Sequence, residues 1–114
     1  MLRDRAYLLD ILEAAKLAVR YVSGKTLEEF LSDIQCQDAV IRRLEIIGEA
    51  TRRISEATRE AMPELPWSDM VGMRNILIHR YDTVDMNVVW DAVHTDLPPI
   101  IAVLEKKLSS EGSL

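Results

Sequence analysis

Arg74, His79 and Tyr81 place a guanidinium, an imidazole and a phenol around a short aliphatic run in the segment RNILIHRY. A guanidinium stabilises the negative charge that develops on a phosphorane, and an imidazole moves protons near neutral pH. Together these two groups suit cleavage of a phosphodiester without a metal ion. The segment is therefore either an active site or the polar end of a structural helix.

Arg74 lies on the apolar side of its predicted helix. Four apolar side chains fall within about 60° of it on a helical wheel, namely Met70, Val71, Leu77 and Ile78. A guanidinium that leaves an apolar surface needs a partner, because a buried and uncompensated charge is costly. Two partners remain open. One is Glu45 or Glu49 in a structural ion pair, and the other is an anionic ligand in a cleft at a subunit interface.

His79 and Tyr81 each have a structural and a chemical interpretation. A histidine near a helix C-terminus suits the helix dipole, and a tyrosine there can close the end of a bundle with its hydroxyl in water. His79 shares a polar stripe with Asn75, one turn earlier. It lies about 140° from Arg74 on an ideal helix, so their convergence requires the reach of the arginine and unwinding near Arg80.

The elements that must position these residues are helices. The chain has only four Gly and four Pro among 114 residues, and Ala, Leu, Ile, Glu and Arg dominate it. A chain of this length can bury one core but is too short to divide comfortably into two domains. We therefore expect an all-α protein with a single domain over residues 1–114, in which residues 109–114 form a flexible polar tail.

Apolar periodicity predicts an antiparallel up-and-down bundle of four main helices plus a short helix. The first helix ends at Ser23 and Gly24. Thr26 and Glu29 have the spacing of a capping box and start the short helix. The third helix runs from about residue 37 to residue 57, and it carries both apolar and charged side chains.

Prolines separate or interrupt the helices predicted in the second half of the chain. The stretch TREAMPELPW is predicted to be a turn-rich connector. Ser68 or Asp69 can then cap the helix that carries the motif. The last helix starts near Asp85 and is interrupted at Pro98, where Asp96 can cap a restarted segment.

Charge and cysteine content exclude several classes of protein. The formal net charge of −5 has the wrong sign for nonspecific binding of polyanions, so any contact with nucleic acid must use a local basic patch. Cys36 is the only cysteine, which rules out an internal disulfide and a cysteine-based zinc site within one chain. Charged residues interrupt the N-terminal apolar run. We therefore expect a soluble cytoplasmic protein with no membrane span and no signal peptide.

Two pairs of arginines have alternative roles. Arg42 with Arg43 and Arg52 with Arg53 form a loose stripe on the third predicted helix. They could guide RNA, but pairing with neighbouring glutamates on a solvated face is the more usual arrangement.

A metal site is the weaker reading of the region after the motif. His79, Asp82 and Asp85 recur at three-residue spacing and could bind a divalent ion. The two aspartates are more simply explained as turn and N-cap residues, so we expect no metal and no cofactor. His94 is taken as a structural or surface residue.

The motif R-x4-H-x-Y, formed by Arg74, His79 and Tyr81 with Asn75 after the arginine, resembles the signature of the HepT-like toxins in the HEPN superfamily. The likeness extends over essentially the whole chain, through the blocks RLEIIGEATRRI, PELPW, GMRNILIHRY and VDMNVVWDAVHTDLPPI. R-x4-H alone occurs often by chance, whereas the ordered set of blocks is specific. The resemblance implies a helical bundle that forms a homodimer or a larger oligomer. In it, arginines and histidines of both subunits line one cleft.

The activity that this resemblance implies is metal-independent endoribonuclease action by the toxin of a type VII toxin–antitoxin pair. Arg74 and His79 would be catalytic, Asn75 would support them, and the RNA substrate could be a transfer RNA. The implied partner is a minimal nucleotidyltransferase of the MntA type, an antitoxin that transfers AMP to Tyr81. A second hypothesis is a noncatalytic helical module that binds a nucleotidyltransferase and assists nucleotide or substrate binding. The net negative charge favours this second hypothesis, and the intact Arg-His pair argues against it.

Overall fold

The computed structural model describes residues 2–79 and 85–110, and it describes the side chains of residues 3–73 and 85–109. Within these ranges the chain forms helices and no strand, which confirms the all-α prediction. The elements are α1 (Leu2–Val22), α2 (Leu27–Leu31), α3 (Ile34–Arg52), α4 (Glu56–Ala61), α5 (Trp67–His79), α6 (Met86–Asp91), the π-helical segment η1 (Ala92–Asp96) and α7 (Leu97–Ser110).

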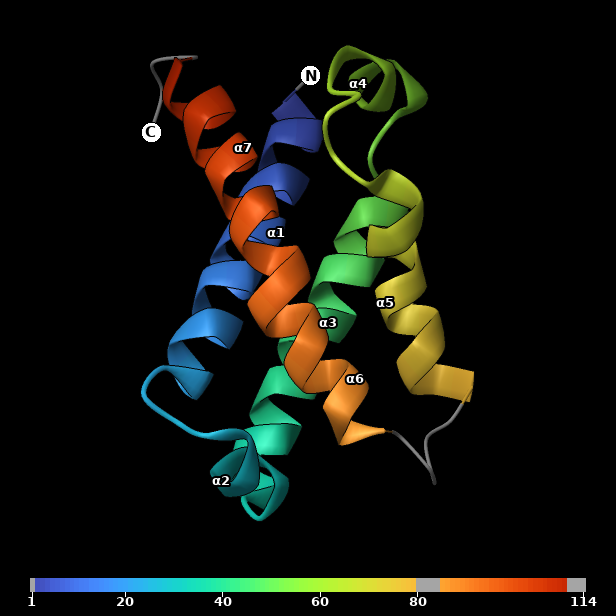
Figure 1. Cartoon of the computed structure of the whole chain (residues 1–114). Coiled ribbons are helices and arrows are strands. Elements are labelled where there is room, and N and C mark those ends of the chain that lie inside the picture. The colour runs from blue at the N-terminus through green and yellow to red at the C-terminus, as the bar shows by residue number, and fades with distance from the viewer. Residues whose placement is uncertain (1, 80–84, 111–114) are drawn as a thin grey trace.

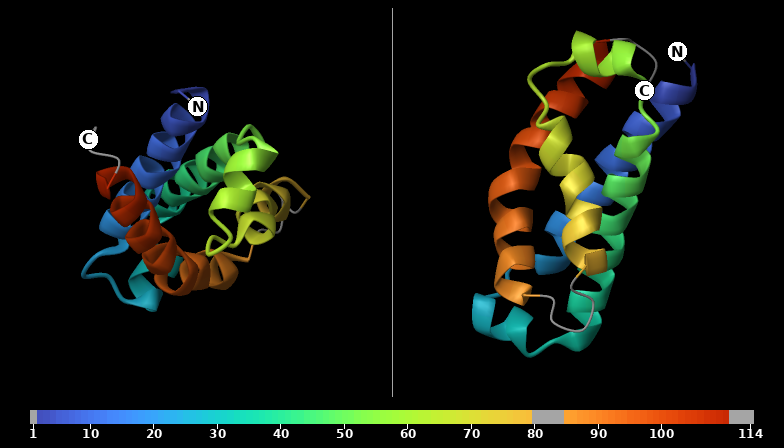
Figure 2. Two further views of the ribbon diagram at one scale, coloured as in Figure 1. Left: turned by 90° about the horizontal axis from the view of Figure 1, so that it is seen from above. Right: turned by 90° about the vertical axis from the view of Figure 1, so that its right-hand side faces the viewer.

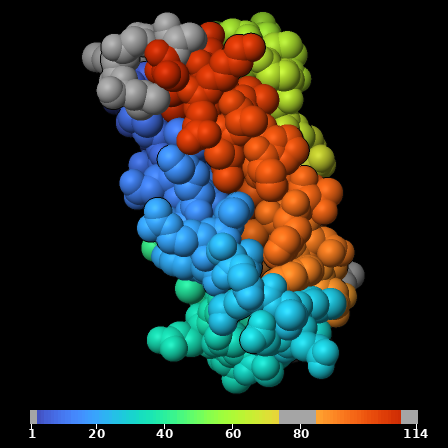
Figure 3. Space-filling view, turned by 60° about the vertical axis from the view of Figure 1, so that its left-hand side comes forward, coloured from blue at the N-terminus to red at the C-terminus, as the bar shows by residue number. Residues whose placement is uncertain are grey.

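Four long rods make up the bundle, because α6, η1 and α7 follow one another as one continuous helix (Figure 1). The rod α3 packs against α1 on one side and against α5 on the other. The rod α1 also packs along α7, and Figure 3 shows these two helices in close contact on one face of the molecule. The short helices α2 and α4 cover opposite ends of the elongated bundle (Figure 2).

The core lies where the apolar stripes of these rods meet. Ile11, Ala15 and Ala18 of α1 are fully buried, as are Val40 and Ile47 of α3. Each large aliphatic side chain buried in this way contributes about 1.5–3 kcal/mol relative to exposure. Within the described residues, no helix combines the length and the hydrophobicity that crossing a bilayer requires.

The turn between α1 and α2 follows the predicted pattern. Gly24 has a φ of 78°, a conformation that glycine adopts without steric cost, and α1 ends just before it. The capping box is confirmed, because the Glu29 amide donates to Thr26 Oγ1 at 3.1 Å and the Thr26 amide donates to Glu29 Oε1 at 2.8 Å.

The third helix and the connector after it differ from the prediction. The helix α3 begins at Ile34 because the Asp33 side chain accepts a hydrogen bond from the Cys36 amide as its N-cap. It ends at Arg52, and the connector then contains α4, which the sequence pattern did not predict. A six-residue helix is too short to show an apolar period, and its N-cap depends on a distant part of the chain.

Two predicted caps are wrong. The helix α5 starts at Trp67, so Ser68 and Asp69 lie inside its first turn, and the Pro66 carbonyl accepts the first helical bond from the Met70 amide at 3.0 Å. Asp96 does not restart the last helix, because α7 follows η1 without a break.

The π-helical segment explains how the last helix passes its prolines. Pro98 and Pro99 lack the N–H groups that would bond to carbonyls four residues earlier, and their rings would crowd those carbonyls. The wider η1 turn lies at these carbonyls, and the Leu97 amide bonds to the Ala92 carbonyl five residues back.

At the C-terminus, Ser109 and Ser110 continue α7, so the tail predicted from residue 109 is helical at its start. Residues 111–114 lie outside the described part.

A buried carboxylate joins the start of α1 to the start of α4. Asp4 is almost fully buried and accepts hydrogen bonds from the Ser55 hydroxyl at 2.5 Å, the Thr58 hydroxyl at 2.6 Å and the Ser55 amide at 3.2 Å. Ser55 is itself the N-cap of α4. The hydroxyl of Ser55, followed by that of Thr58, lowers the pKa of Asp4 from its usual value of 3.8.

Replacing this carboxylate tests how much the contact stabilises the fold. Asp4→Asn is expected to lower the free energy of unfolding by about 1.5–3 kcal/mol at pH 7, the usual value for hydrogen bonds to a charged group. Because the folded-state pKa is lowered, this stabilisation is present above pH 3.8 and is lost as the pH falls through the folded-state value. Urea unfolding measures both effects. Asp10→Asn on the exposed side of α1 is the control, and an equal loss in that variant would contradict the assignment.

Candidate functional site

The motif residues lie in the second half of α5 and beyond it. Arg74, Asn75 and His79 belong to this helix, but their side chains lie outside the described part of the structure. Tyr81, Arg80 and Asp82 fall in residues 80–84, which are also outside it. The convergence of Arg74 with His79, and the partner of Arg74, therefore stay predictions.

A set of contacts at its first residue fixes the position of the motif helix. The Trp67 indole N–H donates to the Met62 carbonyl at 2.9 Å. The guanidinium of Arg59 lies over the Trp67 ring at 5.9 Å from its centroid, and its Nη2 donates to the Thr51 carbonyl at 2.8 Å. These contacts tie the end of α3, α4 and the start of α5 together. The PELPW block thus acts as the anchor of the motif helix.

The helix α5 then lies along α3, and two methionines in its first half are buried. Met70 is fully buried and Met73 nearly so, and α3 is the principal neighbour of α5. Methionine adapts its shape to irregular surfaces and suits such a contact. The first half of α5 is thus held in place, and the second half carries the motif positions.

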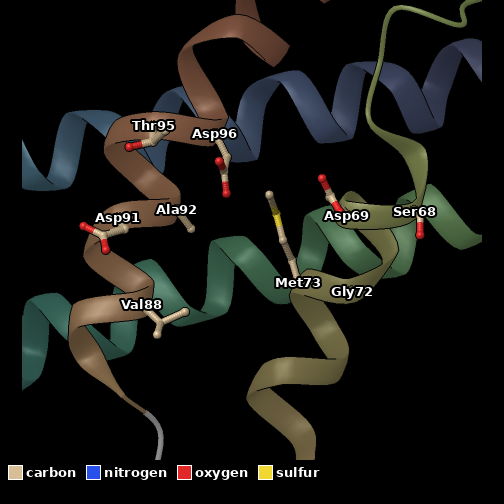
Figure 4. A pocket seen from close by; sticks show the side chains of 9 residues that line it. All are labelled: Ser68, Asp69, Gly72, Met73, Val88, Asp91, Ala92, Thr95 and Asp96. Atoms are coloured by element: carbon tan, nitrogen blue, oxygen red, sulfur yellow. The ribbon is translucent and has the colours of Figure 1, made fainter.

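A groove separates α5 from the rod formed by α6 and η1, and Figure 4 shows it from close by. Its volume is about 880 Å³, and it is lined by Ser68, Asp69, Gly72, Met73, Val88, Asp91, Ala92, Thr95 and Asp96. A smaller hollow of about 300 Å³ shares Asp69, Met73, Thr95 and Asp96 with it and extends toward α7. We call the two together the α5–η1 groove.

The α5–η1 groove combines an apolar floor with an acidic rim. The side chains of Asp69 and Asp96 point toward each other from opposite walls, and Met73 extends between them (Figure 4). Asp91 also lines the groove, and Glu64 lines its extension toward α7. Among the described residues that line it, none is a lysine or an arginine.

The electrostatic environment of the groove acts most on Asp96. Partial burial raises the pKa of Asp96 above its usual value of 3.8, and the negative charges of Asp69 and then Asp91 raise it further. The ionised form of Asp96 is thus destabilised in the groove, and a cation brought close to it would relieve the repulsion between the aspartates.

Sequence reasoning did not predict this groove. The signal available was the pair of small residues Gly72 and Ala92, which face a common space from two helices and leave it unfilled. Gly72 lies in the block GMRNILIHRY and Ala92 in the block VDMNVVWDAVHTDLPPI, but only the packing of the helices brings the two residues together.

The arginine stripe agrees in part with its solvated interpretation. Arg42 Nη1 lies 3.7 Å from Glu45 Oε1 and 3.7 Å from Glu49 Oε1, and the arginine side chain is 60% exposed. Ion pairs at such exposure contribute little to stability. Arg52 and Arg53 are exposed on the last turn of α3 and at its end.

His94 and Asp85 both have structural roles. The His94 ring stacks on Trp90 with centroids 3.9 Å apart, and Trp90 in turn contacts Phe30 at 5.4 Å, so the structural interpretation of His94 is confirmed. Asp85 is the N-cap of α6 and accepts a hydrogen bond from the Asn87 amide at 2.9 Å. Within residues 3–73 and 85–109, no three histidine, cysteine, aspartate or glutamate side chains are grouped so that they could hold a metal ion.

Comparison with known proteins identifies similar chains. A sequence profile described as HepT-like, Ribonuclease HepT-like, matches residues 11–107. The chain is 44% identical over 100 residues to "Probable ribonuclease HepT" of Thermococcus cleftensis, and the aligned region covers 88% of this chain and 91% of that protein. It is 45% identical over 96 residues to the RNase candidate MJ1380 of Methanocaldococcus jannaschii, covering 84% and 88% of the two chains. It is 32% identical over 111 residues to the RNase candidate TTE0752 of Caldanaerobacter subterraneus, and the aligned region covers 97% of this chain and 99% of that protein. No solved structure matches.

The empty space beside Gly72 can be tested by a stability measurement. A Cβ atom added at Gly72 would meet nothing within 4 Å. Gly72→Ala is therefore expected to raise the free energy of unfolding by about 0.5–1 kcal/mol, since glycine costs that much in a helix interior. Urea unfolding provides the measurement. Gly24→Ala is the opposite control, because its φ of 78° makes alanine destabilising there. A loss of stability in Gly72→Ala would show that another group fills this space.

Proposed function

The chain belongs to the HepT-like ribonuclease family, and from this membership we propose that it is a metal-independent endoribonuclease whose active site forms between two copies. The family match over residues 11–107, which contains the intact motif RNILIHRY, carries the proposal. The catalytic residues proposed are Arg74 and His79, with Asn75 in support. The substrate class is RNA, and transfer RNA is the first substrate to assay.

The reaction proposed is a transfer within the RNA backbone. The ribose 2′-oxygen attacks the adjacent phosphorus, and the bond from phosphorus to the 5′-oxygen breaks, which leaves a cyclic phosphate and a 5′-hydroxyl. One histidine accepts the 2′-hydroxyl proton, and another donates a proton to the leaving oxygen. Arg74 holds the scissile phosphate and stabilises the charge that develops on it. Asn75 orients the imidazole of His79 or donates to the phosphate.

This chemistry is the reason to propose a dimer. The reaction uses one base and one acid, and each chain supplies one histidine in the motif. A two-fold axis near the second half of α5 would bring two copies of His79 and of Arg74 into one cleft. It would also concentrate positive charge locally in a protein whose net charge is −5.

We further propose that the protein is the toxin of a type VII toxin–antitoxin pair in the cytoplasm. A nucleotidyltransferase of the MntA type would act as the antitoxin by transferring AMP from ATP to the hydroxyl of Tyr81, with release of pyrophosphate. Tyr81 lies two residues after His79 in the sequence. A bulky group with a negative phosphate at that position would occupy the site and oppose the charge of Arg74.

A noncatalytic role is the second candidate, and the acidic α5–η1 groove favours it. Three aspartates that line this groove, one on the motif helix and two on the facing rod, repel a polyanion rather than attract it. In this role the bundle would bind a nucleotidyltransferase and assist its nucleotide or substrate binding. Purified protein that leaves labelled RNA intact in the presence of a chelator would support it.

Substitution of the two proposed catalytic residues tests the nuclease. His79→Ala is expected to reduce RNA cleavage by about 10²–10⁴-fold, the usual contribution of a general acid or base. Arg74→Ala is expected to reduce it by about 10²–10³-fold, the usual contribution of a group that stabilises developing charge. Cleavage by the unaltered protein should be the same with and without EDTA. Single-turnover cleavage of labelled RNA gives the rates, and circular dichroism verifies the fold. Arg20→Ala and His94→Ala are matched controls outside the motif and should keep their activity. Retained cleavage in both motif variants would refute the assignment.

The AMP-transfer proposal makes a separate prediction. Incubation with a cognate nucleotidyltransferase and ATP is expected to raise the mass of the protein by one or more AMP groups and to stop cleavage. Tyr81→Phe should keep its nuclease activity and escape inactivation, because only the phenolic oxygen is removed. The chain has two other tyrosines, and Tyr21→Phe serves as the matched control. Intact mass spectrometry detects the added AMP, and the comparison of the two variants locates it. Continued modification of Tyr81→Phe would disprove the site.

A further inference from the structure

The α5–η1 groove is an open trough between α5 and the rod formed by α6 and η1, whose principal packing neighbours are other helices. The principal neighbour of α5 is α3, whereas α6 and η1 contact α1, α2, α3 and α7. The space left between them has a volume of about 880 Å³. Apolar side chains of Met73, Val88 and Ala92 line this space, and Val88 is 42% exposed. An apolar trough flanked by two helices has the shape that a third helix fills.

The charges around the trough restrict what can lie in it. Asp69 and Asp96 face each other across the floor, and Asp91 and Glu64 lie along the same edges. The negative charge of these carboxylates opposes RNA as the occupant. It also argues against a second copy bound groove to groove, because a two-fold contact places the same surface on both sides and would oppose six aspartates.

The occupant must therefore combine apolar and basic side chains. We propose that the α5–η1 groove binds an amphipathic helix of a partner protein. The apolar face of that helix lies on Met73, Val88 and Ala92, and its lysines or arginines pair with Asp69 and Asp96. Positive charges brought there would relieve the mutual repulsion of the aspartates, which also contributes to the raised pKa of Asp96. The groove is lined by the first half of α5, so the occupant would lie on the same helix as Arg74 and His79.

The binding site is independent of the proposed nuclease activity. A partner helix at the first half of α5 can be detected without any RNA in the assay. Failure of cleavage would leave this proposal intact, and failure of binding would leave the proposed cleavage intact.

The experiment uses a fluorescent synthetic peptide that forms a helix with leucines on one face and lysines on the other. Fluorescence anisotropy measures its binding to the full chain at physiological salt concentration. Two variants change the groove. The double variant Asp69→Asn with Asp96→Asn removes the charges without changing side-chain size, and Gly72→Leu fills the trough where no atom lies within 4 Å of the added Cβ. The control Asp10→Asn with Glu60→Gln removes the same charge from exposed sites on α1 and α4.

Each groove variant is expected to weaken peptide binding by about ten-fold or more. The charge-matched control should change it by less than about two-fold. A peptide with glutamates in place of the lysines should not bind. Equal weakening in the control would show nonspecific attraction and overturn the proposal, as would unchanged binding in both groove variants.

The other possible occupants give distinct results. Sedimentation of Gly72→Leu is expected to match that of the unaltered protein. A change from dimer to monomer in that variant would show that a second copy fills the groove. Weaker binding of an RNA oligonucleotide by Gly72→Leu would show that RNA enters it. Either result would overturn the proposal. The isosteric double variant keeps the test valid if Gly72→Leu does not fold.

Discussion

The attachment of the motif helix to the bundle is the contact on which the rest of the structure depends. The indole of Trp67 bonds to the Met62 carbonyl, and Arg59 covers its ring, so the first residue of α5 is fixed before the helix runs along α3. The helix α5 then packs along α3, and Met70 and Met73 of α5 are buried. Because the helix is held from that side, its other side borders an open groove. The same packing that fixes the helix carrying the motif therefore also leaves a surface for a partner.

The electrostatics of the molecule set a second constraint. A net charge of −5 and an acidic groove beside the motif helix oppose a polyanion over most approaches. Cleavage of RNA therefore needs positive charge concentrated at one place, and the arginines of two copies around a two-fold axis would provide it. The carboxylate of Asp4 has a different effect, because it is buried and stabilises the fold by accepting hydrogen bonds from the hydroxyls of Ser55 and Thr58.

The sequence predicted those features of the fold that depend on interactions between residues close together in the chain. The helix class, the capping box of Thr26 with Glu29, the turn at Gly24 and the start of the last helix at Asp85 all follow from neighbouring residues. The helix α4 was missed because its capping residue Ser55 is fixed by Asp4, 51 positions away. The π-helical passage before Pro98 and Pro99 and the α5–η1 groove likewise arise from helix packing and backbone adjustment. The motif itself was recognisable from residue types and spacing, and its geometry lies outside the described side chains.

A shared active site makes activity depend on association, and this dependence tests the central claim most directly. Cleavage of a labelled RNA can be measured over a dilution series of the protein, beside the fraction of dimer from sedimentation. If two copies form the site, activity per chain should fall on dilution in parallel with the dimer fraction. Constant activity per chain at concentrations where only monomer sediments would contradict the account.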